Sequence, residues 1–169
     1  MTTMQRQFGR GYGALLQRGQ PAAYAHVRGS EEYADIHGTV LFFPVRGGTL
    51  VSAEVYGLPA GDGVCGNPVF GFHIHENGEC SGNETDPFAD TGGHYNPQNC
   101  PHPFHAGDLP PLFGNNGYAF CAVVTDRFHV QEVIGRSVVI HSHPDDFRTQ
   151  PSGDSGNKIA CGVIRRYVG

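Results

Sequence analysis

Residues 71–80 read GFHIHENGEC and place His73 and His75 on either side of a single isoleucine. The apolar neighbours and the alternation are typical of a β-strand, in which successive side chains point to opposite faces. The two imidazoles then share one face, about 6.6 Å apart along the chain at 3.3 Å per residue. They are either part of a site for zinc, copper, iron or nickel, or two unrelated polar residues on the solvated face of an edge strand.

The composition indicates one β-rich domain. A chain of 169 residues is long enough to close one hydrophobic core. Its 25 glycines, 12 prolines and 11% aromatic residues favour turns and strands, while a charged share of only 16% argues against a disordered or coiled-coil chain. The net charge is -5 without a basic run, and no apolar stretch approaches the ~20 residues that span a bilayer, so nucleic acid and membrane are poor partners.

Short apolar runs bounded by turn residues follow one another after Pro21. They predict about eight strands, in runs at 22–27, 38–45, 49–58, 69–76, 118–124, 129–143 (split by a turn at Gly135) and 158–167. The segment VRGGTL between the second and third runs predicts a hairpin. Residues 1–20 show no sustained period and are interpreted as an N-terminal tail, so the domain is expected to span 21–169.

Two polar stretches, 77–117 and 144–157, separate the runs. Many short strands with two long loops predict an antiparallel sandwich or barrel that carries its function on the loops. An irregular loop as long as 77–117 is unusual in a compact domain unless something internal fixes it.

The longer loop contains GGHYNPQNCPHPFHAGDLPPLF, which offers three imidazoles and one carboxylate, in His94, His102, His105 and Asp108. These are the four ligands of a closed tetrahedral zinc site, and a bound ion would explain how so irregular a loop stays folded. The alternative is a flexible loop that happens to carry histidines. A third cluster, VVIHSHPDD, is expected to point one of His141 and His143 inward and the other outward.

Five pieces, GFHIHENGEC, GGHYNP, HAGDLP, VVIHSHPDD and GNKIACGVI, resemble the copper/zinc superoxide dismutase family in content and order, across about residues 22–165. The resemblance implies an all-β fold, an eight-stranded antiparallel Greek-key β-barrel whose two long functional loops cover a copper and a zinc ion. It also implies that the chain converts superoxide to dioxygen and hydrogen peroxide by copper redox cycling.

Carried over position by position, the resemblance implies a copper site made by His73, His75, His94 and His141. It implies a zinc site made by His94, His102, His105 and Asp108. His94 would therefore bridge both ions and take a proton during turnover. Asp145 matches the carboxylate that links a copper histidine to a zinc histidine, and Cys80 and Cys161 match the family's disulfide.

Lys158 is the clearest departure from the family pattern. The family has an arginine beside the copper three residues before the second disulfide cysteine, and this chain has lysine there. Lysine keeps the positive charge that attracts a small anion but not the planar pair of donors, so activity is expected, at a reduced rate. The loop before Lys158 is short, as in bacterial members.

Three cysteines have no role implied by the family, and five cysteines leave at least one thiol unpaired within a monomer. Cys121 is interpreted as a buried apolar thiol, and Cys65 has no assigned role. Cys100, between His94 and His102, is interpreted as incidental, with a substitute metal ligand as the alternative.

Two other functions compete with superoxide dismutation. A non-catalytic copper/zinc binding or storage protein would use the same ligands, whereas a metallohydrolase would need open positions and a free carboxylate base that this ligand set does not offer. A homodimer is compatible with the family. The chain shows no secretory leader, so the cytoplasm is expected, with the periplasm or secretion as open alternatives.

Overall fold

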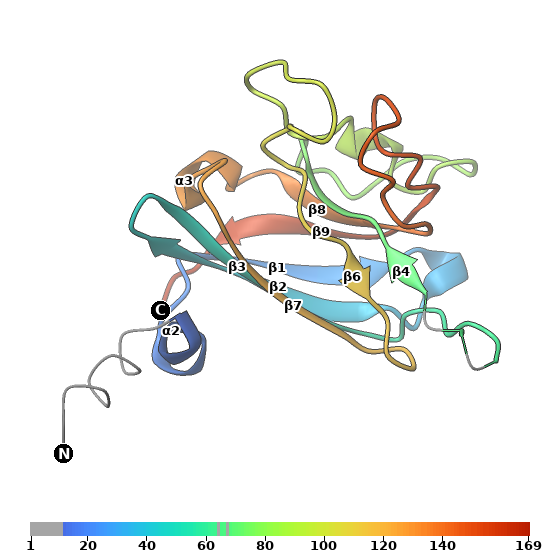
Figure 1. The fold of residues 1–169 in the computed structure, drawn as a ribbon, viewed down its shortest axis with the longest axis horizontal. Helices are drawn as coiled ribbons and strands as arrows, with labels where there is room; N and C mark the ends of the chain where they lie inside the picture. Colours follow the sequence, from blue (N-terminus) through green and yellow to red (C-terminus); the bar gives the residue numbers. More distant parts are fainter. Residues whose placement is uncertain (1–11, 64, 67) are drawn as a thin grey trace.

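Antiparallel strands form most of the fold, as the sequence predicts (Figure 1). The computed structural model describes residues 12–63, 65–66 and 68–169. The strands are β1 Ala23–Gly29, β2 His37–Val45, β3 Gly48–Tyr56, β4 Val69–Phe70, β5 Phe72–His75, β6 Leu112–Phe113, β7 Ala119–Thr125, β8 Ser137–His141 and β9 Lys158–Arg166. The helices are α2 Tyr12–Arg18 and α3 Val130–Val133, with single 3-10 turns η1 Glu31–Tyr33 and η2 Ala89–Thr91.

A large curled sheet runs in the order β5-β8-β9-β1-β2-β3-β7, and a small sheet pairs β4 with β6. Strand β4 leads directly into β5 at one edge of the large sheet, and β6 packs beside β7 at the other edge. The small sheet therefore lies between the two edges of the large one (Figure 1). This arrangement confirms the predicted antiparallel barrel-like fold.

The core fills the concave side of the curled sheet. Alternate residues of the strands meet there, among them Phe42, Val51, Phe72 and Val138, each at most 2% exposed. Because side chains alternate across a strand, the neighbours of these residues face away from the core. On β5 this alternation places the side chains of His73 and His75 on the face opposite the core.

The β2–β3 hairpin matches its prediction. Val45 pairs with Gly48, which leaves Arg46 and Gly47 as a two-residue turn. Gly47 has a φ of +82°, in the left-handed region that favours glycine.

The predicted strand at 129–134 is wrong, because this segment contains the short helix α3. Glu132 accepts a hydrogen bond from the His129 amide, as in a capping box, and Val130 and Val133 are buried three residues apart. The predicted strand at 69–76 is interrupted at Gly71. The Gly71 amide donates to the His143 carbonyl and its carbonyl accepts from the His141 amide, so β4 and β5 pair with different strands.

Two further details differ from the expected loops and tail. The stretch 77–117 contains the two-residue strand β6 and the turn η2, where no strand was expected. The part of the expected tail that the structure describes forms helix α2, with no fully buried side chain; residues 1–11 lie outside the described residues. No helix in the described parts of the chain is long and apolar enough to cross a membrane.

Candidate metal centre

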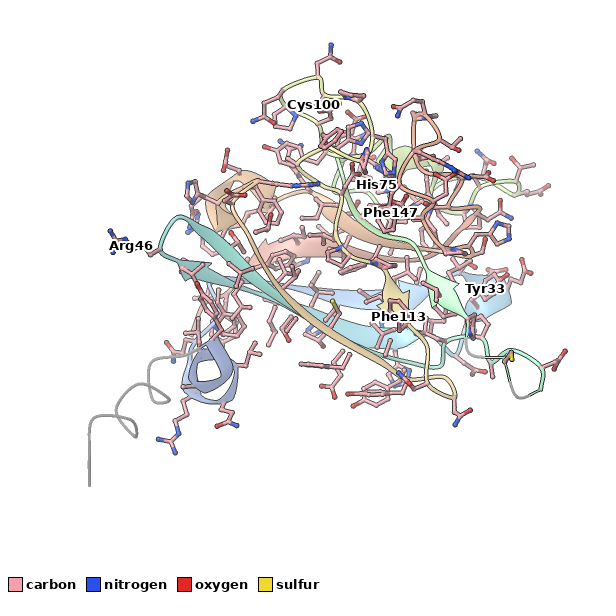
Figure 2. All side chains as sticks on the ribbon, viewed as in Figure 1. Tyr33, Arg46, His75, Cys100, Phe113 and Phe147 are labelled. Carbon is pink, nitrogen blue, oxygen red and sulfur yellow. A yellow bond between two sulfur atoms is a disulfide. The ribbon has the colours of Figure 1, made fainter. Side chains whose placement is uncertain are left out.

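Three of the candidate histidines project from two adjacent strands. Strand β5 pairs with β8 through Phe72 and Ile140, and β8 ends at His141. His73 is 0% exposed, His75 2% and His141 4%, because the loops cover this face of the sheet (Figure 2). His73 and His75 share one face, as predicted, but a buried one, which excludes the solvated-face alternative. His143 is exposed, so the expected inward and outward pair is also found.

The other candidate ligands lie in the long loop 77–117, which reaches the histidines of β5 by pairing with the free edge of that strand. Ile74 donates to the Gly107 carbonyl at 2.9 Å and accepts from the Tyr95 amide at 2.8 Å. Isolated bridges join His75 to His94 and His73 to Asp108. The edge strand therefore fixes two separate segments of the loop by backbone hydrogen bonds, and the loop is not a freely moving one.

Two clusters of ligating atoms result, and they share one residue. The first contains His73, His75, His94 and His141, and the second contains His94, His102, His105 and Asp108. Within each cluster, one ligating atom of every residue lies within 4.8 Å of the others. Their members are the same residues as in the two ligand sets that the resemblance implies. Cys100 belongs to neither cluster of described residues, and its amide and carbonyl bond the Asn96 side chain.

The imidazole nitrogens of the two clusters are placed to bind metal ions rather than to hydrogen-bond to one another. His73 Nδ1 and His94 Nε2 are buried and have no hydrogen-bond partner among the described residues, while His102 Nδ1 is buried 3.1 Å from Asp108 Oδ2. Unpartnered buried nitrogens are costly, and bound cations would satisfy them. His75 Nε2 also lies 3.2 Å from His141 Nε2, and His105 Nδ1 lies 3.4 Å from His94 Nδ1. The first pair belongs to one cluster and the second pair to the other, and each pair is spaced as two ligands of one ion are.

Asp145 connects the two clusters through the other side of the rings. Its Oδ2 accepts a hydrogen bond from His73 Nε2 and its Oδ1 accepts one from His102 Nε2, both at 2.8 Å. The Phe147 amide donates to Oδ1 at 2.7 Å. Burial opposes the charge of Asp145, but these hydrogen bonds hold its pKa below the usual range. Asp145 therefore fixes which nitrogen of each ring remains free for a metal.

Burial also favours the neutral form of His73, His75 and His141. It lowers the pKa of His73 to about 4, although hydrogen bonding to Asp145 acts in the opposite direction. Burial and the neighbouring histidines lower the pKa of His75 and of His141 well below the usual value. A neutral imidazole has the free lone pair that a metal requires. Burial opposes the charged form of Asp108, but hydrogen bonding from His94 lowers its pKa, so Asp108 is a carboxylate.

Two side chains hold the loop from outside the clusters, and sequence reasoning missed both. Arg127 Nη1 donates to the carbonyls of Pro103, His105 and Asp108 at 2.9, 3.2 and 3.2 Å. Gln150 accepts from the His102 amide at 2.9 Å and donates to the His102 carbonyl at 2.7 Å. The short loop after β7 and the second long loop thus both restrain the ligand-bearing loop.

Lys158 lines a pocket of about 350 Å³ together with three of the candidate ligands, His75, His94 and His141. It is the first residue of β9 and pairs across the sheet with His141. Its ammonium donates to Asp86 Oδ2 and to the Phe88 carbonyl, both at 3.0 Å. The resemblance implies that Lys158 lies beside the copper site; in the structure it lines the same pocket as His141, and its contact with Asp86 was not predicted.

A disulfide joins Cys80 to Cys161, as predicted, and packs against Phe88 and Val139. Cys65, Cys100 and Cys121 are free thiols. Cys65 is exposed, and Cys121 is half-buried beside the core, less buried than expected. Burial raises the pKa of the Cys121 thiol.

Comparison with known proteins gives one consistent result. Residues 36–164 match the sequence profile of a family described as copper/zinc superoxide dismutase. A superoxide dismutase [Cu-Zn] of Deinococcus radiodurans is 36% identical over an alignment of 170 positions, which covers 90% of this chain and 88% of that protein. A superoxide dismutase [Cu-Zn] of Photobacterium leiognathi is 34% identical, and the alignment covers 76% of this chain and 78% of that protein. The solved Cu/Zn superoxide dismutase from Brucella abortus superposes with a TM-score of 0.68 at 28% identity, covering 83% of this chain and 98% of that one.

Proposed function

The chain belongs to the copper/zinc superoxide dismutase family, and on this premise we propose which of its residues carry the reaction. The chain is an oxidoreductase that converts superoxide to dioxygen and hydrogen peroxide, with copper and zinc as cofactors. The assignment of residues rests on one observation, which is that the two clusters of ligating atoms share His94.

We assign copper to the cluster of His73, His75, His94 and His141, because four imidazoles suit both oxidation states of that metal. We assign zinc to the cluster that includes Asp108, because zinc prefers tetrahedral sites of nitrogen and carboxylate ligands. Bound copper supplies one-electron redox chemistry, and bound zinc supplies a fixed positive charge beside His94.

His94 is the residue that can handle a proton in this scheme. Its Nδ1 lies 2.7 Å from Asp108 Oδ1 on the zinc side, and its buried Nε2 has no partner among the described residues. If His94 served as a zinc ligand on the Asp108 side, its Nε2 would be the nitrogen left to accept and release a proton. His94 also lines the pocket, although its Nε2 is buried.

Lys158 is the cation that we assign to substrate binding. Superoxide is an anion, and the chain has a net charge of -5, so a local positive charge must offset the general repulsion. Lys158 supplies an ammonium in the same pocket as His94 and His141. Arg148, in the second long loop, has an 86% exposed side chain near Asp146 and does not line this pocket.

The competing assignment, a copper/zinc storage protein without turnover, is not favoured, because the similar proteins are superoxide dismutases. The experiment that separates the two activities combines metal analysis with kinetics. The protein, loaded with one copper and one zinc per chain, should consume superoxide in a pulse-radiolysis assay, and His94→Ala should lose most of this activity. Full metal loading without superoxide consumption would support storage instead.

Several sequence expectations remain predictions within this proposal. They are the single domain at 21–169 with its N-terminal tail, the homodimer, and the absence of nucleic-acid and membrane partners. The compartment is also a proposal. The Cys80–Cys161 disulfide is of a kind that persists in oxidising surroundings, which favours the periplasm or secretion over the expected cytoplasm.

A further inference from the structure

The Asp, Glu, Lys and Arg side chains that line the pocket of Lys158 are mostly acidic. Its lining includes three carboxylates, Glu32, Glu84 and Asp86, and among the described lining residues Lys158 is the one Lys or Arg. Apart from bound metal ions, an anionic substrate therefore has a single side-chain ammonium for local attraction.

That ammonium is already engaged. Lys158 Nζ lies 3.0 Å from Asp86 Oδ2 and 3.0 Å from the Phe88 carbonyl oxygen, and its side chain is 15% exposed. An ammonium has three N–H donors, so these two contacts leave one donor for an anion in the pocket. The Asp86 carboxylate also cancels the charge of Lys158 as seen from a distance.

Asp86 is held firmly in this position. Its Oδ1 accepts the Phe88 amide at 3.0 Å, while its backbone carbonyl accepts the amides of Asn83 and Ala89. Phe88 packs on the Cys80–Cys161 disulfide, which ties the Asp86 segment to β9 close to Lys158. The Lys158–Asp86 ion pair is therefore held in place in the pocket wall.

We propose that Asp86 restrains the reaction by competing with the anionic substrate for the Lys158 ammonium. The inference rests on the assignment of Lys158 to substrate binding. It makes Asp86 a positioning residue that acts through Lys158.

The test uses the copper- and zinc-loaded protein and azide, a small monoanion whose binding is followed by the copper absorption spectrum. Asp86→Asn keeps an oxygen that accepts the Phe88 amide but removes the charge that engages Lys158. We expect its azide dissociation constant to fall about tenfold, as expected when a charged hydrogen-bond competitor is removed. The rate constant for superoxide should rise about threefold at low ionic strength and should fall with added salt.

Two further variants separate competition from charge alone. Glu84→Gln removes one negative charge from the same lining, so it should tighten azide binding by about threefold or less. In a Lys158→Met background, Asp86→Asn should give no more than the Glu84→Gln effect. If Asp86→Asn shows no folded protein, Asp86→Ser, whose hydroxyl can also accept the Phe88 amide, replaces it.

Azide binding that is unchanged or weaker in Asp86→Asn overturns the proposal, because Asp86 would then support Lys158 or have no influence on it. An Asp86→Asn effect that exceeds the Glu84→Gln effect in the Lys158→Met background also overturns it. A wild-type protein that binds both metals but consumes no superoxide contradicts the proposed function, and the azide comparison is still decisive for Asp86.

Discussion

Lys158 Nζ lies 3.0 Å from Asp86 Oδ2, a contact that joins the start of β9 to a loop 72 residues earlier in the chain. The lysine stands at the place where the family has an arginine, and the contact shows how its charge is held beside the metal ligands. The position is therefore the most informative one to alter in this chain.

Reversal of the charge at Lys158 should slow the reaction. Lys158→Glu changes the pocket charge by two units and should lower the rate constant for superoxide about tenfold at low ionic strength. Added salt should then raise the rate, because salt screens repulsion. Pulse radiolysis across an ionic-strength series measures both effects. Lys158→Arg is the control and should be at least as fast as the wild type; equal rates for all three proteins would remove this residue from the mechanism.

Asp145 should govern metal affinity without touching a metal. It accepts from both His73 and His102, whereas the amide of Asp145→Asn has one acceptor oxygen and presents a donor to the second ring. We expect a loss of about 10- to 100-fold in zinc or copper affinity, measured by chelator competition. Asp146→Asn is the matched control, since Asp146 bonds Arg148 and Thr149 in its own loop. Equal affinities in the two variants would refute the role of Asp145.

Arg127 should stabilise the part of the long loop, residues 102–108, that carries three of the four zinc-set residues. Its guanidinium donates to three carbonyls of residues 103–108, so Arg127→Ala should lower the free energy of unfolding by about 1–2 kcal/mol. Amide hydrogen exchange in residues 103–109 should become faster than in the wild type. Arg148→Ala, at an 86% exposed side chain, is the control and should leave this exchange unchanged. Equally slow exchange in Arg127→Ala would show that the loop is held by other contacts.

The disulfide should contribute a large part of the stability of the metal-free protein. Its cysteines are 81 residues apart, and the chain-entropy estimate for such a loop is about 4 kcal/mol. Denaturant unfolding of metal-free Cys80→Ser/Cys161→Ser against the wild type measures this difference. A change below about 1 kcal/mol would contradict the estimate.

Much of the candidate site is predictable because it depends on residue types in a fixed order. Alternation on a strand places His73 and His75 together without any knowledge of the rest of the fold. The convergence of His94, His102, His105 and Asp108 follows from the family resemblance and agrees with the cluster in the structure.

The contacts that the sequence does not reveal join distant residues in irregular segments. Asp86 lies in a loop without periodicity, so nothing local indicates its partner in β9. Arg127 likewise bonds backbone carbonyls, which any residue could provide. Such contacts depend on how the loops pack over the sheet, which local patterns do not encode.

The errors in secondary structure have local causes. Helix α3 has only four residues and contains two valines, which favour strands, but burial of Val130 and Val133 and the Glu132 contact with the His129 amide override that preference. The break at Gly71 arises from its backbone bonds to His141 and His143, which no periodicity indicates. The Glu three residues after His129 was a readable signal for the helix.

The central claim is that His94 connects two metal ions. Crystals of the protein supplied with copper and zinc, with anomalous diffraction collected at the absorption edge of each element, test it most directly. The account predicts one copper at His94 Nε2 and one zinc at His94 Nδ1. A map in which His94 contacts a single ion, or none, would contradict it.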